Sequence, residues 1–233
     1  MTAIFRREFK AYFTSPLGYI FLAVMYYFGG QFFSDVLGSG SSYIQYVFSS
    51  LFTTVMFVVP ILTMRLMSEE KKQKTDQLLF TSPVNLSGIV IGKYLAAFVM
   101  YLLGIAITVL YVIIMATFTQ PDWNILLGNF LGLLLVGASL IAIGLFVSSL
   151  TQSQMVSAVV TFAIMMFLFM FDSIAQTVPT DFLKKLFTQM SIMGRYNDFV
   201  SGQLNIAHVI FFVSVIVIFN FLTVRVLEKK RWS

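Results

Sequence analysis

Long apolar stretches alternate with short polar ones along the chain, and six apolar stretches have the length of membrane spans. A transmembrane helix needs about 20 mainly apolar residues to cross the hydrocarbon of a bilayer. The six stretches lie at about residues 17–33, 47–66, 89–118, 125–150, 155–171 and 207–226. None has an ionisable residue in its central part, and Lys93 lies at the start of the third, where its long side chain can reach the interface. The pattern predicts an all-α membrane protein with six transmembrane helices.

The N-terminal segment, residues 1–15, has the pattern of an amphipathic helix. Its aromatic residues fall at helical spacing: Phe5, Phe9, Tyr12 and Phe13. Basic residues stand between them: Arg6, Arg7 and Lys10. Such a helix lies in the membrane interface with its aromatic face among the acyl chains, and Ser15-Pro16 predicts that it ends before the first span. The simpler alternative is that the basic residues only anchor that span.

The loop between the second and third spans, residues 67–88, has both a charged and a semi-apolar part. It begins with the charged run Glu69-Glu70-Lys71-Lys72. Thr75, Leu78 and Leu79 then share one face of a predicted short helix, which breaks at Ser82-Pro83. A solvated loop needs no apolar face, whereas a segment that docks on another protein does. We therefore expect this loop to bind a partner.

The segment before the last span, residues 172–205, also mixes apolar and polar positions. Its apolar residues recur at i, i+4, i+5 and i+8: Phe182, Leu186, Phe187 and Met190. This spacing predicts one or two short interfacial or re-entrant helices. At about 34 residues the segment is too short to be an independent domain of ordinary size.

Composition supports a membrane assignment and a single domain, residues 1–233. Hydrophobic residues make up 58% of the chain and charged residues 11%, against about 45–50% and about 25% in soluble domains. With the N-terminus inside, twelve of the 15 basic residues fall on the cytoplasmic side, all except Lys184, Lys185 and Arg195. Basic residues gather on the cytoplasmic side of membrane proteins, so we expect a plasma-membrane protein with both termini in the cytoplasm. No basic patch interleaved with aromatics lies in a soluble segment, which argues against nucleic-acid binding.

Motifs for catalysis, metal binding or phosphate binding are absent from the sequence. The chain has no cysteine, no zinc-protease motif and no nucleophile elbow. The run from Gly88 to Tyr94 is one residue too short for a phosphate-binding loop and leads into a span. His208 is the only histidine, at the outer end of the sixth span. A pH-sensing or catalytic role is open to it, but a lone interfacial polar residue is the preferred interpretation.

These features together resemble the permease subunits of ABC-2 type ABC transporters, in particular the short gliding-motility-like permeases. The resemblance rests on the signature Glu69-Glu70, Thr75-Asp76-Gln77, Leu78-Leu79 and Ser82-Pro83-Val84, followed by Gly92-Lys93. The charged C-terminal ending from Glu228 to Trp232 also resembles the family. One departure is Lys74, which occupies the position of the usual glycine before Thr75.

The resemblance implies a mechanism and a set of partners. The 67–88 loop would dock on a separate ABC ATPase through Thr75, Leu78, Leu79 and Pro83, while Glu69 and Glu70 would link it to Arg6, Arg7 or Lys10. The chain would bind no cofactor, and ATP and Mg²⁺ would bind to the ATPase. A second permease, identical or similar, would complete a dimer in contact with membrane lipids, and an auxiliary extracytoplasmic subunit is a further partner such complexes can recruit. The 172–205 segment would cap the exit.

Three other functions compete with an ATP-driven exporter. An ATPase-independent channel or carrier usually needs ionisable groups along its path, which the spans lack. An intramembrane enzyme lacks a catalytic set. A complex that transmits force or regulates another protein without moving a solute stays open. The uncharged spans favour an apolar or amphipathic solute.

Overall fold

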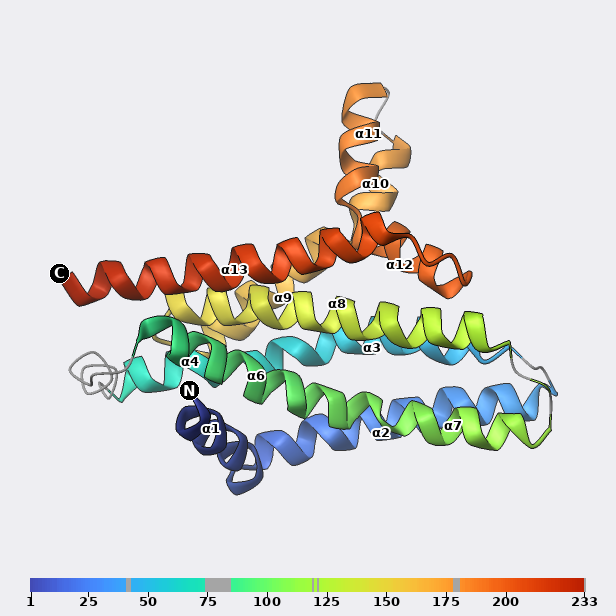
Figure 1. Cartoon of the computed structure of the whole chain (residues 1–233), viewed down its shortest axis with the longest axis horizontal. Coiled ribbons are helices and arrows are strands. Elements are labelled where there is room, and N and C mark those ends of the chain that lie inside the picture. Colours follow the sequence, from blue (N-terminus) through green and yellow to red (C-terminus); the bar gives the residue numbers. More distant parts are fainter. Residues whose placement is uncertain (41–42, 74–84, 119, 121, 178–180, 233) are drawn as a thin grey trace.

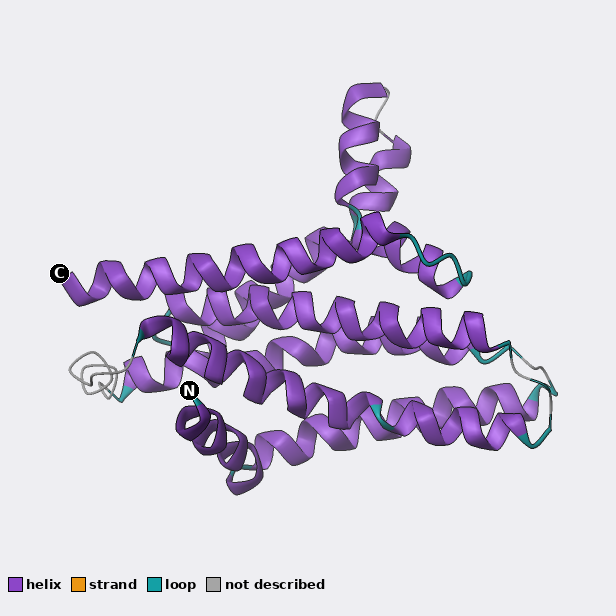
Figure 2. Cartoon of the chain, in the orientation of Figure 1, coloured by secondary structure: helices purple, strands orange, loops and turns teal. Residues whose placement is uncertain are grey.

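The computed structural model describes residues 1–40, 43–73, 85–118, 120, 122–177 and 181–232, and over these residues the chain folds as helices without strands. Six helical stretches are long and apolar enough to cross a membrane, as the hydrophobic pattern predicted. They run side by side in one bundle (Figures 1 and 2). The prediction of an all-α membrane protein with six spans is therefore confirmed.

Three of the six spans include more than one helix. The spans consist of α2 (Pro16–Gly38), α3 (Gln45–Thr63) with α4 (Arg65–Lys72), α6 (Leu86–Ile105) with α7 (Ile107–Ala116), α8 (Trp123–Leu150), α9 (Gln154–Phe169) with the first residues of α10 (Phe171–Thr177), and α13 (Ile206–Trp232). The second span ends at Lys72, so the charged run that was assigned to a loop is helical. The third span is divided at Ala106, where the apolar pattern predicted no break.

An N-terminal helix, α1 (Thr2–Thr14), precedes the spans and lies at an angle to them (Figure 1). Ser15 is extended, with φ −112° and ψ 156°, and Pro16 opens α2. Proline is well placed at the first position of a helix because that position needs no N–H donor. The predicted end of the first helix at Ser15-Pro16 is thus observed, and α1 packs against α6 and α2.

Helix α8 is the centre of the bundle. It packs against α3, α6, α9 and α13, and 72% of its most apolar window is buried, against 11% for α13. The glycines of α8 lie on two opposite sides of the helix: Gly132 meets Phe199 of α12 (Ile192–Val200), whereas Gly137 meets Tyr101 of α6 and Gly144 meets Thr63 of α3. The glycines therefore let three different helices approach α8.

Three short helices follow α9 and lie at one end of the bundle, which we name the α12 end. They are α10 (Phe171–Thr177), α11 (Asp181–Met190) and α12, so short helices occur where the sequence predicted them. The α10–α11 pair projects sideways from the spans, while α12 packs on α8 (Figure 1). The opposite end, with α1, α4 and the chain's C-terminus, is named the α4 end.

The close contacts of α8 predict a specific loss of stability. A Cβ atom on Gly137 would overlap the ring of Tyr101, so Gly137→Ala should lower the free energy of unfolding by about 1–3 kcal/mol through overpacking. Gly30→Ala is the matched control, because its Cβ would lie 3.7 Å from the nearest atom, the Tyr111 hydroxyl. Thermal unfolding in detergent measures both, and equal melting temperatures for the two variants would contradict the packing described.

Candidate functional site

Polar side chains gather at the α4 end, where α1, α4 and α6 meet. Of the residues predicted to act in coupling, Glu69 and Glu70 lie on α4 and Arg7 on α1. The remaining predicted contact residues of the loop fall outside the described residues: Thr75, Leu78, Leu79 and Pro83. Helix α4 leads directly into that segment, so the geometry of α4 fixes where the segment leaves the bundle.

The centre of this cluster is a buried lysine, Lys93. Its side chain is 1% exposed, and its ammonium nitrogen lies 3.0 Å from Glu8 Oε1, 3.0 Å from Glu70 Oε1 and 2.6 Å from the carbonyl oxygen of Leu66. An ammonium group has three N–H donors, and each finds an acceptor here. The expectation that Lys93 reaches out to the interface is wrong, because its charge is compensated inside the protein by carboxylates from α1 and α4.

Arg7 closes the network on the side of α1. Its guanidinium donates to Glu8 Oε1 at 2.7 Å and also pairs with Glu70. Burial by itself would raise the pKa of Glu8, but the charge of Lys93 and the hydrogen bond from Arg7 hold that pKa below its ordinary value of 4.5. Burial by itself would lower the pKa of Arg7, yet Glu8 and Glu70 raise it. Glu8 and Arg7 are therefore both charged at neutral pH.

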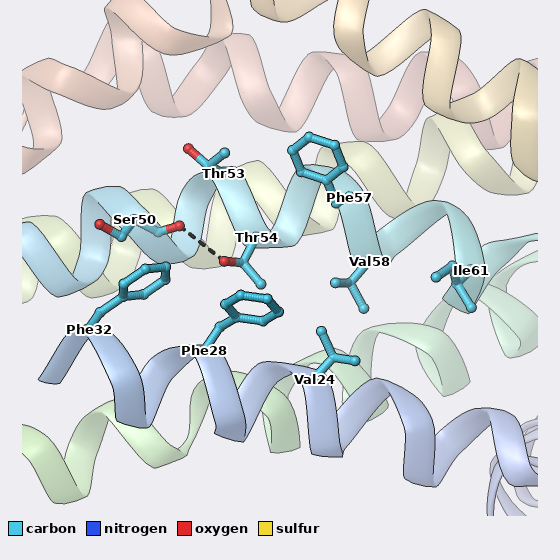
Figure 3. Close-up of a pocket in the computed structure, with 9 residues that line it drawn as sticks. All are labelled: Val24, Phe28, Phe32, Ser50, Thr53, Thr54, Phe57, Val58 and Ile61. Atoms are coloured by element: carbon cyan, nitrogen blue, oxygen red, sulfur yellow. Dashed lines mark hydrogen bonds between the residues drawn. The ribbon is translucent and has the colours of Figure 1, made fainter. Parts of the chain in front are cut away.

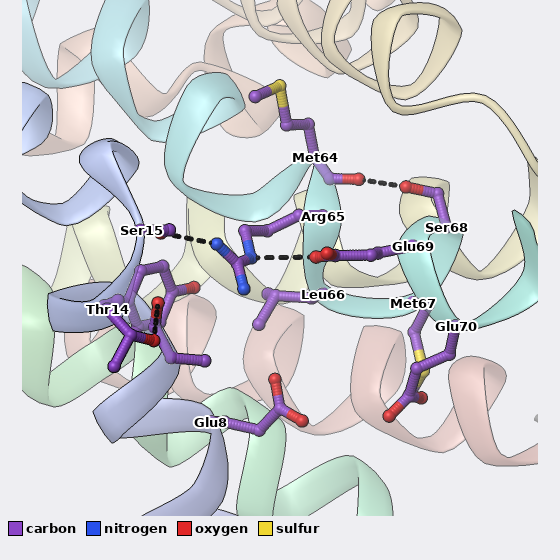
Figure 4. A network of polar contacts seen from close by, with 12 residues as sticks. Glu8, Thr14, Ser15, Met64, Arg65, Leu66, Met67, Ser68, Glu69 and Glu70 are labelled. Carbon is purple, nitrogen blue, oxygen red and sulfur yellow. Dashed lines mark hydrogen bonds and ion pairs between the residues drawn. The ribbon is translucent and has the colours of Figure 1, made fainter. Parts of the chain in front are cut away.

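Arg65 makes a second connection between α4 and the start of the chain (Figure 4). Its guanidinium donates to Ser15 Oγ at 2.6 Å and pairs with Glu69 Oε2 at 3.1 Å. It also lies over the ring of Tyr12, whose hydroxyl donates to the Leu62 carbonyl at 3.0 Å. Glu70 thus contacts α1 directly, whereas Glu69 reaches the α1–α2 joint through Arg65.

The other basic residues predicted to make this link are placed differently. Arg6 and Lys10 are exposed on α1, and neither forms an ion pair within the described part of the chain. Arg7 alone of the three meets a glutamate of α4. Glu8 and Arg65 were not among the predicted site residues, and Lys93 was noted without a role in coupling. Its place next to an apolar span was a usable signal, since charges inside membrane segments commonly mark functional sites.

Helix α8 forms hydrogen bonds with the opposite side of α4. The Ser148 hydroxyl accepts hydrogen bonds from the backbone nitrogens of Met67 and Ser68, at 3.0 and 3.1 Å, and donates to the Met64 carbonyl at 3.1 Å. Lys71 donates to the carbonyl oxygen of Ser149. Because α4 is bonded to α8 on one side and to α1 and α6 on the other, it cannot move without disturbing both.

An apolar cavity of about 720 Å³ lies between α2 and α3 (Figure 3). Rings of Phe28, Phe32 and Phe57 line the cavity together with aliphatic side chains, and the polar side chains in its wall are hydroxyl-bearing residues of α3. Thr54 uses its hydroxyl to donate to the Ser50 carbonyl at 3.2 Å, while Thr53 is exposed. The size and lining of the cavity are typical of binding sites for small, mainly apolar ligands, whose volumes range from about 300 to 1,000 Å³.

Removing the charge of Lys93 should destabilise the protein strongly. Lys93→Met leaves the carboxylates of Glu8 and Glu70 with Arg7 as the cation that still pairs with both, and breaking a buried ion pair costs about 3–5 kcal/mol. Lys10→Met, at an exposed position of α1, should change stability by less than about 0.5 kcal/mol. Thermal unfolding in detergent compares the two, and a mild effect of Lys93→Met would show that Lys93 does not hold the network together.

The lowered pKa of Glu8 predicts how this stabilisation depends on pH. A carboxylate with a lowered pKa in the folded state stabilises the protein above its unfolded pKa and loses that effect as the pH falls through the folded value. The difference in melting temperature between the wild type and Glu8→Gln should therefore be largest above pH 4.5 and shrink below it. A difference that stays constant down to acid pH would contradict the charge pairing of Glu8.

Comparison with known proteins agrees with this architecture. The sequence profile of the ABC-2 family transporter proteins matches residues 37–227, from the end of α2 to the last turns of α13. A comparison with curated proteins finds no match. The matched region includes α4, Lys93 and Ser148, and it leaves out α1, whose contacts with them come from the structure alone. The profile covers well over half of the chain, and with its six spans the chain belongs to the ABC-2 family of transporter proteins.

Proposed function

We propose that this permease subunit couples a separate ABC ATPase to the export of an apolar or amphipathic solute. The observation that carries the proposal is the position of α4, which is fixed by buried charges on one side and by Ser148 on the other. The segment that follows α4 carries Thr75, Leu78, Leu79 and Pro83. A partner that bound this segment would therefore act on α1, α6 and α8 together.

The proposed mechanism needs no chemical step on this chain. ATP and Mg²⁺ bind to the ATPase, and the movement of that subunit displaces the segment after Lys72. Helix α4 then passes the displacement to α8 through Ser148 and to α1 through Glu70. Since the α4 end carries the basic N- and C-terminal segments, we place it in the cytoplasm, in accordance with the excess of basic residues there.

The lining of the spans supports the proposed solute class. The cavity between α2 and α3 is lined mainly by apolar groups, with phenylalanine rings and a few hydroxyls, and the buried charges sit at the α4 end rather than along the bundle. Such surroundings favour an apolar chain with a small polar group over a charged sugar. Six spans make half of an ordinary transporter, so a second permease, identical or similar, would complete the assembly.

Co-purification tests the central step. The protein is solubilised in mild detergent from membranes of its natural host, and we expect a soluble ABC ATPase to be recovered with it. Leu78→Asp should abolish this pairing, because a charge on the docking face opposes apolar contact. Leu204→Asp is the matched control, since Leu204 is exposed in the connection between α12 and α13.

Each outcome has a definite meaning once thermal unfolding shows that the variants are folded. If the ATPase still co-purifies with the Leu78→Asp variant, this segment does not dock on the ATPase. A folded wild-type protein without any ATPase would favour an independent channel or carrier. Flux in proteoliposomes with the ATPase separates export from regulation, and a preference for an anionic sugar would overturn the proposed solute class.

A further inference from the structure

A second polar cluster lies at the α12 end and joins α11, α12 and α13. Its centre is the chain's single histidine, His208, on the first turn of α13. His208 Nε2 lies 2.7 Å from Asp198 Oδ2, and His208 Nδ1 lies 2.8 Å from Nη1 of Arg195. Both partners belong to α12, and the histidine side chain is 15% exposed. His208 is therefore not the lone polar residue that the sequence suggested.

The partners of His208 determine where its proton sits. An arginine guanidinium only donates hydrogen bonds, so Nδ1 of His208 must accept from Arg195. The hydrogen then resides on Nε2, which donates to Asp198. This is the neutral imidazole. A protonated imidazole carries a hydrogen on both nitrogens, and its Nδ1–H would face the donor and the positive charge of Arg195. The observed arrangement fits only the neutral form.

Arg195 also contacts residues of α11 and α13 other than His208. Its Nε and Nη2 donate to the carbonyl oxygen of Gln189, near the end of α11, at 3.1 and 2.6 Å. Its guanidinium also lies 4.1 Å from the centre of the Phe211 ring on α13. Burial lowers the pKa of Arg195, and the charge of Asp198 opposes that change. A single side chain thus fastens the end of α11 to α13, and it depends on a neutral His208.

We propose that protonation of His208 releases Arg195 and so loosens α11 and α12 from α13. The imidazolium would keep its bond to Asp198, while repulsion would drive the guanidinium away from Nδ1, Gln189 and Phe211. Histidine is the side chain whose charge ordinarily changes between about pH 5 and 8. The cluster is then a pH-sensitive latch at the end of the bundle opposite to α4.

The neighbouring charges do not remove this effect. Asp198 on α12 is already bonded to His208 in the neutral state. Asp172 of α10 lies next to Gly194 of α12: a Cβ added to Gly194 would be 3.3 Å from Oδ1 of Asp172. The Asp172 carboxylate is therefore available to Arg195 after its release. Lys184 on α11 is exposed and basic, and Asp122 at the start of α8 caps its own helix through Asn124 and Ile125. The packing partner α8 meets α12 through Asn129, which is uncharged.

Distance measurements on the isolated chain test the latch without any ATPase. The chain has no cysteine, so spin labels can be attached to cysteines introduced at Leu183 on α11 and Ile210 on α13, both exposed. Lowering the pH from about 7.5 to about 5.5 should populate a longer distance. For a single linked proton the ratio of open to closed forms can rise by at most about 100-fold over two pH units.

His208→Gln is the deciding variant, because glutamine cannot take up the proton. Its distance distribution should not respond to pH, and a response equal to that of the wild type would overturn the proposal, as would a wild type without response. Should this variant fail to fold, Arg195→Gln replaces it and should show the longer distance at both pH values. A normal pH response in Arg195→Gln would likewise overturn the latch.

Discussion

A buried positive charge sets the arrangement of the α4 end. Lys93 lies in apolar surroundings, where an unpaired ammonium would be very costly, and its three hydrogen bonds go to α1 and α4. Neither helix can leave its position without exposing or unpairing this charge. The N-terminal helix, the end of the second span and the start of the third are therefore held as one unit, and this unit carries the segment proposed to meet the ATPase.

Helix α8 connects that unit to the other end of the molecule. Near its C-terminus Ser148 bonds the backbone of α4, and near its N-terminus Asn129 donates to the Val200 carbonyl of α12 at 3.3 Å. Between them, glycines on opposite sides allow tight packing against α3, α6 and α12. Protein interiors packed this closely transmit displacement rather than absorb it. The two polar clusters are thus connected through one helix, with the ion pairs of Lys93 at one end and the hydrogen bonds of His208 at the other.

Two sequence expectations were wrong for a common reason. Lys93 was assigned to the interface, and His208 was considered alone. In each case the outcome depends on partners from another helix: Glu8 of α1 for Lys93, and Arg195 and Asp198 of α12 for His208. Spacing along one segment indicates which residues share a face but does not indicate which residues that face will meet.

The sequence by itself determined the six spans, the stop at Ser15-Pro16, the helix before it and the short helices before the last span. These features depend on local hydrophobicity and backbone preference, which act over a few turns. Only the tertiary structure decided that Glu70 meets Arg7 and Lys93, that Ser148 bonds α4, and that His208 faces an arginine. Those choices depend on which helices pack together, because the free energy of a buried charge is set by the groups that surround it.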